Sequence, residues 1–245
     1  MGILVIGDSC LDVYTYCKTS RLAPDRPVPV LETIKVVETP GMAYNVYKNL
    51  QGLSNAVSIV TNDNWKTVKK TRFVDDKSNH MFVRVDTTHP LTPIDLNNIS
   101  FDYDSIVISD YDKGFLTRED IYHICDNHPQ VFLDTKKDLG PWALKAKFIK
   151  INNYEYERSK TFIDREISGK VIKTVGGDGC VYRDKIFPVM NKVEVLDVSG
   201  AGDTFMAGLV FQYTKTKDLE SAINFANKCA SEVVQHKGVT TLCQK

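Results

Sequence analysis

The sequence predicts an α/β fold: a doubly wound, mostly parallel sheet flanked by helices, with a small β flap beside it. Two features of the 245 residues lead to this prediction. Short β-branched runs alternate with helix-like segments, which is typical of βαβ units. These short runs are also apolar throughout, as expected of parallel strands that are covered on both faces.

Six apolar runs are the predicted strands of the main sheet. They are Ile3–Ile6, Ala56–Val60, Ser105–Ile108, Val131–Leu133, Phe148–Ile151 and Val171–Val175. After the last run, a Gly-Asp-Gly turn at residues 177–179 leads into Val181–Tyr182. Turn residues between two short strands indicate a hairpin at this end of the sheet.

Helix-like segments lie between the strands. Thr117 has the character of an N-cap, because acidic residues follow it in the first turn before Ile121–Asn127. Asp218 is the expected cap of a helix over Leu219–Gln235. The other predicted helices are Gly41–Leu50, Tyr154–Phe162 and Ala201–Tyr213.

Two regions depart from the alternation and predict a small antiparallel flap. Pro27–Val37 is extended and flanked by prolines, and Thr71–Val74 and Met81–Val85 form a second extended pair around the polar turn Asp75–His80. Together they predict lid segments at about residues 14–40 and 71–90 of one domain that spans residues 1–245. An ordinary surface hairpin explains the same pattern equally well.

Composition excludes several classes of function. The chain carries 31 basic and 31 acidic residues, so non-specific binding to nucleic acid or to an anionic membrane is not expected. No apolar run is long enough to span a bilayer, and Ile3–Ile6 has no basic lead of a signal peptide. The six cysteines form no CxxC pair, which favours reduced thiols in a cytoplasmic protein.

The segment Val195–Gly208 gives the strongest chemical indication. A strand-like run ends at Asp197, and Gly200, Ala201 and Gly202 then lead into a helix. The first N–H groups of a helix lack internal partners and lie at the positive end of its dipole, so this segment predicts an anion site.

Asp203 directly follows the three small residues and is the candidate catalytic base. A carboxylate at this point can accept the proton of an attacking hydroxyl during phosphoryl transfer. Asp197 could orient the loop or bind a cation. A tight turn with an N-capping aspartate is the structural alternative, but the longer pattern Asp-x-x-Gly-Ala-Gly-Asp-Thr-Phe is far more specific.

Asp197–Phe205 resembles the C-terminal signature of the PfkB, or ribokinase-like, carbohydrate kinases, and the similarity extends over essentially the whole chain. Thr19–Pro24 (Thr-Ser-Arg-x-x-Pro) and Ser109–Gly114 (Ser-Asp-Tyr-x-Lys-Gly) resemble the kinase domain of the bifunctional heptose enzymes more than ribokinases or fructokinases. The resemblance implies a sugar kinase that uses ATP and Mg²⁺, with heptose 7-phosphate as acceptor. Whether a monovalent cation is needed stays open.

The resemblance also assigns residues to the nucleotide. Asn152 and Glu155 match an Asn-x-x-Glu element that handles the phosphates and magnesium, with Glu155 reaching the ion through water. From the pattern alone, this pair would be a helix cap with a first-turn acid. The other implied nucleotide residues are Thr174, Gly176, Gly177, Gly179, Asp197 and, at the adenine, Asn227.

On the sugar side, Asp12, Gly41 and Asn45 match positions that hold hydroxyl groups. The remaining substrate candidates are Asp110 and three basic residues that could meet a substrate phosphate, Arg72, Lys113 and Lys136. Taken singly, Asp12 would be a turn or strand-end residue, and each basic residue would be a solvated surface charge.

The chain departs from the family in three places. It ends at Lys245, so a nucleotidyltransferase domain is not expected. It passes directly from Thr61–Asn64 to Lys70–Arg72, where the family usually has a further helix and strand, and this should trim one sheet edge away from Asp203. Met42 replaces a usual glycine, which would narrow the sugar pocket or shift its backbone.

Two other functions remain as alternatives. The chain could be a PfkB-type kinase for another sugar or a nucleoside, or a non-catalytic relative that binds a sugar or a nucleotide. In each case the expected partner is a small molecule. An exposed flap strand could also pair across a two-fold axis and give a homodimer.

Overall fold

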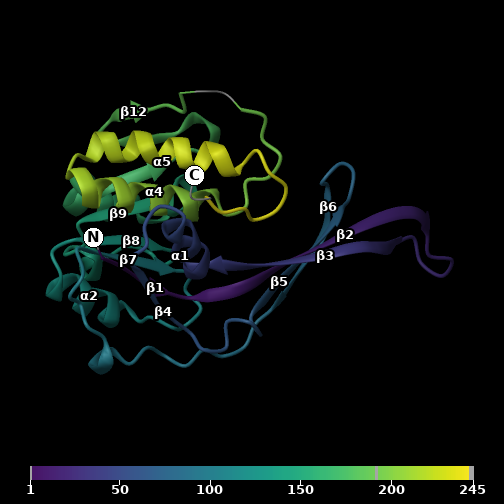
Figure 1. Cartoon of the computed structure of the whole chain (residues 1–245), viewed down its shortest axis with the longest axis horizontal. Helices are drawn as coiled ribbons and strands as arrows, with labels where there is room; N and C mark the ends of the chain where they lie inside the picture. The colour runs from purple at the N-terminus through teal and green to yellow at the C-terminus, as the bar shows by residue number, and fades with distance from the viewer. Residues whose placement is uncertain (1, 191–192, 243–245) are drawn as a thin grey trace.

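The computed structural model describes residues 2–190 and 193–242, and in this part of the chain the long strands form two sheets (Figure 1). The main sheet has the order β12-β11-β10-β9-β8-β7-β1-β4. Its strands are β1 (Ile3–Gly7), β4 (Val57–Thr61), β7 (Ser105–Asp110), β8 (Val131–Thr135), β9 (Phe148–Asn152), β10 (Val171–Thr174), β11 (Cys180–Tyr182) and β12 (Lys185–Phe187). The second sheet, here the flap sheet, has the order β3-β2-β5-β6 and projects from one side of the main sheet.

All six predicted strands of the main sheet are present. Strands β4, β1, β7, β8, β9 and β10 lie side by side and are parallel. Strand β11 pairs antiparallel with β10 across the Gly-Asp-Gly turn, as the sequence indicated, and β12 then pairs antiparallel with β11. Alternate residues of β1 enter opposite layers of core, because Ile3 and Val5 pack on one side while Leu4 and Ile6 pack on the other. The doubly wound prediction is confirmed.

Helices cover both faces of the main sheet. The helices are α1 (Ala43–Gln51), α2 (Arg118–Asn127), α3 (Asn153–Phe162), α4 (Ala201–Thr216) and α5 (Leu219–Val233). Side chains of α1, α4 and α5, such as Val46, Leu209 and Ile223, pack against the face that holds Ile3. Side chains of α2 and α3, such as Ile121 and Phe162, pack against the other face.

The helix starts follow the predicted capping chemistry. Thr117 and Asp120 form a reciprocal capping box at the start of α2. Asp218 accepts hydrogen bonds from the backbone N–H groups of Glu220 and Ser221 at the start of α5. Three boundaries were wrong: α1 begins at Ala43 because the residues before it remain in strand β3, α4 ends at Thr216 rather than Tyr213, and α5 ends at Val233 rather than Gln235.

The flap sheet is larger than the sequence predicted. Its strands are β2 (Ser9–Leu22), β3 (Pro29–Met42), β5 (Lys69–Asp75) and β6 (Met81–Thr87). Strand β2 was missed, although it lies in the middle, and it runs parallel to β5, so the sheet is mixed rather than antiparallel. The alternation in β2 is weak, because one face carries Asp12, Tyr14 and Tyr16 and the other Val13 and Thr15.

Two further segments differ from expectation. Strand β12 was not predicted, and the strand-like run before Asp197 is irregular, with the N–H groups of Leu196 and Asp197 donating to the carbonyl of Val234. At the other edge, β4 is the outermost strand, and the chain passes from it directly into the flap sheet.

Two absences hold for residues 2–190 and 193–242. No helix there has both the length and the apolar character needed to cross a bilayer. The five cysteines in these residues are free and buried, and Cys243 lies outside them.

Candidate active site

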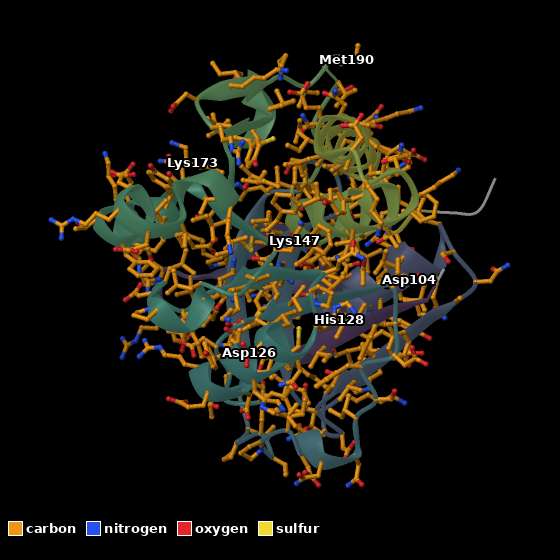
Figure 2. The ribbon with its side chains drawn as sticks, turned by 90° about the vertical axis from the view of Figure 1, so that its left-hand side faces the viewer. Asp104, Asp126, His128, Lys147, Lys173 and Met190 are labelled. Carbon is orange, nitrogen blue, oxygen red and sulfur yellow. The ribbon has the colours of Figure 1, made fainter. Side chains whose placement is uncertain are left out.

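The candidate site residues gather at the carboxyl ends of the central parallel strands. Figure 2 faces the opposite end of the sheet, where Asp104, His128 and Lys147 lie shortly before β7, β8 and β9 begin. At the carboxyl ends of these strands come Tyr111, Asp134 and Asn152. Open α/β sheets bind ligands at this end, so the fold itself directs attention there.

The start of α4 forms the predicted glycine-lined loop. Gly200 has a positive φ of 81°, and no side chain caps the helix. A Cβ atom on Gly200 would lie 2.7 Å from Nδ2 of Asn45, so only glycine fits beside this amide. The uncapped N-terminus leaves N–H groups that can bind an anion.

Asp203 lies in the first turn of α4 and is 4% exposed. Its Oδ2 accepts a hydrogen bond from Nδ2 of Asn45 at 2.9 Å, and its Oδ1 accepts one from the hydroxyl of Tyr111 at 2.7 Å. Burial raises the pKa of Asp203 to about 6, although both hydrogen bonds oppose this shift. The carboxylate is therefore mostly ionised at neutral pH, and its pKa is close to the value expected of a general base.

A buried ion pair lies next to the glycine-lined loop. Nζ of Lys150 is 2.6 Å from Oδ2 of Asp134, and both side chains are buried. A Cβ atom on Gly202 would lie 3.0 Å from this ammonium, so Lys150 places positive charge beside the predicted anion site. Sequence reasoning missed Lys150, although a lysine inside the apolar run Phe148–Ile151 was an indication.

The Asn-x-x-Glu element folds as a helix cap with an acidic residue in the first turn, which is what the pattern alone predicted. Asn152 and Glu155 form a capping box at the start of α3, and Glu155 also pairs with Lys136. Within residues 2–190 and 193–242, no three Asp, Glu, His or Cys side chains gather as a metal site.

These residues fit magnesium only as an ion held mainly by the nucleotide phosphates. Both oxygens of Glu155 accept hydrogen bonds from Asn152 or Lys136, and Oδ1 of Asp134 is buried without a hydrogen-bond partner. Magnesium usually keeps several of its waters, so a site with few protein ligands suits it.

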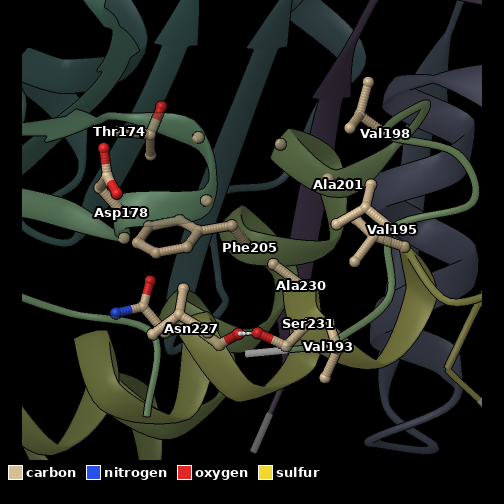
Figure 3. A pocket seen from close by; sticks show the side chains of 16 residues that line it. Thr174, Asp178, Val193, Val195, Val198, Ala201, Phe205, Asn227, Ala230 and Ser231 are labelled. Atoms are coloured by element: carbon tan, nitrogen blue, oxygen red, sulfur yellow. Dashed lines mark hydrogen bonds between the residues drawn. The ribbon is translucent and has the colours of Figure 1, made fainter. Parts of the chain in front are cut away.

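Five of the eight predicted nucleotide residues line one cavity of about 420 Å³, whereas Asn152, Glu155 and Asp197 are not among its lining residues (Figure 3). This volume is in the range of small-molecule sites. The cavity is lined by Thr174, Gly176, Gly177, Gly179 and Asn227, together with Ala201 and Gly202 of the loop. Phe205 and Val198 form part of its apolar wall.

Asp197 is not among the residues that line the cavity. Its two oxygens accept hydrogen bonds from the N–H groups of Ser199 and Gly238, so it holds the loop in place. This is the loop-orienting alternative expected from the sequence.

The sugar-side candidates Asp12, Gly41 and Arg72 lie together. Oδ1 of Asp12 is 2.5 Å from an Arg72 nitrogen, and a Cβ atom on Gly41 would lie 2.0 Å from Oδ2 of Asp12. Strand register places Lys70 and Arg84 on this same face of the flap sheet. Sequence reasoning had not assigned those two basic residues to the site.

Met42 keeps a backbone conformation suited to glycine. Its φ is 59°, in the left-handed region, and its side chain is buried against Cys10 and Val68. With ψ at −132° this conformation is sparsely populated for a residue with a Cβ atom and costs about 1–3 kcal/mol. The substitution is therefore accommodated by strain.

Two predicted substrate residues, Asp110 and Lys113, lie on the main sheet side of the site and not with Asp12 and Arg72 in the flap sheet. Asp110 is buried and accepts hydrogen bonds from Thr135 and Lys137, so it braces the loop after β7. Lys113 is exposed on that loop. The site thus brings together Asp203, Asn45 and the loop at 200–202, whereas Asp110 is committed to internal contacts.

Comparison with known proteins agrees with this geometry. Residues 107–245 match the profile described as pfkB family carbohydrate kinase. The bifunctional protein HldE of Nitratiruptor sp. is 31% identical over 293 aligned residues, which cover 98% of this chain and 62% of that protein. The chain thus spans less than two thirds of that relative, and an alignment longer than the chain means that the relative has additional residues inside the matched region.

Solved structures share the fold. The ribokinase from Thermotoga maritima superposes with a TM-score of 0.73 at 18% identity, covering 97% of this chain and 94% of that one. Arabidopsis thaliana ribokinase complexed with ribose and ATP gives a TM-score of 0.69 at 15% identity, with coverages of 99% and 96%. These matches confirm the ribokinase-like α/β fold. Because the family profile covers more than half of the residues, the chain belongs to the pfkB family of carbohydrate kinases.

Proposed function

We propose that this carbohydrate kinase transfers the terminal phosphoryl group of ATP to the anomeric hydroxyl of a heptose 7-phosphate or a related sugar phosphate. The observation that carries the proposal is the pairing of Asp203 with the uncapped, glycine-lined start of α4. The heptose acceptor is supported by the resemblance of Thr19–Pro24 and Ser109–Gly114 to heptose kinases, and by the basic residues beside Asp12.

The nucleotide is proposed to occupy the cavity in Figure 3, with its terminal phosphate at Gly200–Gly202. The adenine ring of the nucleotide would lie against Phe205 and Asn227. The ammonium of Lys150 would add positive charge beside the terminal phosphate. A magnesium ion bound with the nucleotide would neutralise phosphate charge, with Glu155 holding it through water.

Asp203 is proposed as the general base. The acceptor hydroxyl gives its proton to the carboxylate while its oxygen forms the bond to phosphorus and the bond to ADP breaks. A pKa near 6 keeps most of this carboxylate ionised at pH 7.

The flap sheet is proposed to act as a lid over the sugar. One of its faces carries Asp12, Arg72 and Arg84, which suit hydroxyl and phosphate groups. The turn between β5 and β6 also reaches the loop before α4, because Nδ2 of Asn79 donates to the carbonyl of Leu196 at 3.0 Å. A closed flap would exclude water and limit wasteful hydrolysis of ATP.

A substrate panel tests the proposal. ADP release is measured by a coupled assay with heptose 7-phosphate, fructose, ribose and adenosine. We expect the highest kcat/KM for heptose 7-phosphate. A preference for another acceptor would support a different kinase of the family, and calorimetric binding of a sugar without ADP release would support a non-catalytic relative.

We also propose that the outer face of the flap sheet pairs with a second copy of the chain. Val36, Val83 and Val85 are 54%, 46% and 49% exposed on the face opposite Asp12. A patch on such a projecting sheet can be self-complementary across a two-fold axis. Light scattering should give a dimer that Val83→Lys dissociates, whereas Ile186→Lys, an exposed apolar position on β12, should not. A monomeric wild-type chain would contradict this.

A further inference from the structure

Tyr111 is a hydrogen-bond partner of Asp203 to which the sequence assigned no role. Among the described residues, Asn45 donates a side-chain hydrogen bond to one oxygen of the carboxylate and Tyr111 to the other, and the two donors come from different parts of the fold. Asn45 lies in the first turn of α1, and Tyr111 follows the carboxyl end of β7. Because each oxygen is held separately, the carboxylate plane cannot rotate without breaking a hydrogen bond.

Tyr111 is itself held from several sides. Its backbone N–H donates to Oδ2 of the buried Asp8 at 2.6 Å. Its ring lies 4.8 Å from Nζ of Lys70 in the flap sheet and 5.3 Å from Nζ of Lys136 after β8. Both ammonium groups attract the face of an aromatic ring, so the ring is fixed between the flap and main sheets.

We propose that Tyr111 is a positioning residue of phosphoryl transfer, whose hydroxyl fixes Oδ1 of Asp203 and keeps this carboxylate ionised. The inference rests on the proposed role of Asp203 as general base. An ionised carboxylate offers about four acceptor positions on its two oxygens, so the sugar hydroxyl can bind while Tyr111 and Asn45 stay in place.

The phenol is suited to permanent donation. Burial and the negative charge of Asp203 raise the pKa of Tyr111 well above its usual value of 10.0. The hydroxyl therefore keeps its proton across the range in which Asp203 titrates, and Tyr111 can only donate to the carboxylate. This separates its role from that of a proton relay.

Several charged groups act on Asp203, so the contribution of Tyr111 must be isolated by substitution. They are Asp134 in β8, Lys150 in β9, Lys70 in β5 and Lys136 after β8, whereas burial raises the pKa of the nearby Cys10 thiol in β2 to about 12 and keeps it neutral. Tyr111→Phe leaves all of these in place and removes one hydrogen bond to the charged form. The pKa of Asp203 should then rise from about 6, by about one unit.

Tyr111→Phe should also change how kcat/KM depends on pH. Asp203 must be ionised to act, so kcat/KM falls as the pH drops through the pKa of the free enzyme. Tyr111→Phe should move this acid limb to higher pH by about one unit. A merely structural role would lower the rate at every pH and leave the limb unmoved.

The experiment records pH profiles of kcat/KM with heptose 7-phosphate for the wild type, Tyr111→Phe and Tyr182→Phe. Tyr182 is the matched control, because its hydroxyl also donates a hydrogen bond, to the carbonyl of Gly169, but it lies in β11 away from Asp203. A shifted limb in Tyr111→Phe alone is the expected result. Equal limbs in all three enzymes would overturn the proposal.

A second measurement needs no substrate. Carbon-13 NMR of protein labelled at the aspartate carboxyl groups follows the titration directly, and Asp203→Asn identifies the resonance by its loss. The resonance should titrate near pH 6 in the wild type and at higher pH in Tyr111→Phe, and an unchanged titration in a folded variant would overturn the role of Tyr111. Undiminished activity of Asp203→Asn would instead remove the proposed base, so the two failures are distinguishable.

Discussion

The main sheet and the flap sheet use their strands in different ways. Main-sheet strands such as β1 and β8 are buried along their whole length, with helices on both faces. In the flap sheet, one face carries charged residues and the other exposes valines to solvent. The comparison suggests that stability resides in the main sheet, while the flap sheet is free to serve ligand binding.

The site lies where the two sheets meet. Asp203 and Lys150 belong to the body around the main sheet, whereas Asp12 and Arg72 belong to the flap sheet. Tyr111 contacts both, through Asp203 and through the ammonium of Lys70. Catalysis should therefore depend on the junction more than on either sheet alone.

The largest effect on stability is expected in the main sheet. Phe132→Ala in β8 removes a side chain that is 0% exposed, which should cost about 3–5 kcal/mol of unfolding free energy. Leu22→Ala in β2, where the side chain is 60% exposed, should cost less than about 0.5 kcal/mol. Urea unfolding measures both, and equal losses would break the comparison.

The buried ion pair at the carboxyl end of the main sheet should come next. Lys150→Met leaves Asp134 buried and uncompensated, at a cost of about 3 kcal/mol. Adding Asp134→Asn should recover part of this loss in the unfolding free energy. Phosphoryl transfer should remain impaired in the double variant, because the positive charge beside Gly202 is missing, and full recovery of turnover would argue against that role.

A flap substitution should change the binding of one substrate and leave the binding of the other unchanged. Arg72→Met removes the partner of Asp12 and a candidate phosphate ligand, so the KM for the sugar phosphate should rise about tenfold or more. The KM for ATP should stay unchanged. Steady-state kinetics with each substrate varied in turn provides the check, and parallel changes in both KM values would contradict the division of roles.

The smallest effect is expected at the contact between the flap turn and the body. Nζ of Lys237 donates to the carbonyls of Asp76 and Lys77 at 2.8 and 3.1 Å. Lys237→Met should weaken flap closure by about 1 kcal/mol, or roughly fivefold in kcat/KM. Limited proteolysis should cut residues 75–80 faster, and unchanged cleavage would show that this contact does not hold the flap.

The same contrast explains what the sequence could predict. The main-sheet strands are continuous apolar runs, such as the one that contains Ile106 and Ile108, because both faces of the sheet are covered. These strands could therefore be predicted from the sequence pattern. Strand β2 mixes Asp12 and Tyr14 on one face with Val13 on the other, and only its pairing with β3 and β5 identifies it as a central strand.

Site residues divide in a similar way. Asp203 and its glycines form one contiguous motif, so they were predicted together. Lys150 and Tyr111 are single polar residues in separate segments. Their roles depend on their neighbours in the folded protein, Gly202 and Asp203, so the sequence alone did not indicate them. Asn152 and Glu155 show the converse case, because one pattern serves both a helix cap and a nucleotide site.

The most direct test of the central claim is single-turnover phosphoryl transfer by Asp203→Asn, followed by rapid quench with labelled ATP and the preferred sugar. We expect transfer to slow by at least ~10²-fold while ATP and sugar binding, measured by calorimetry, are kept. Transfer at nearly the wild-type rate in this variant would show that the carboxylate at the start of α4 is not the base.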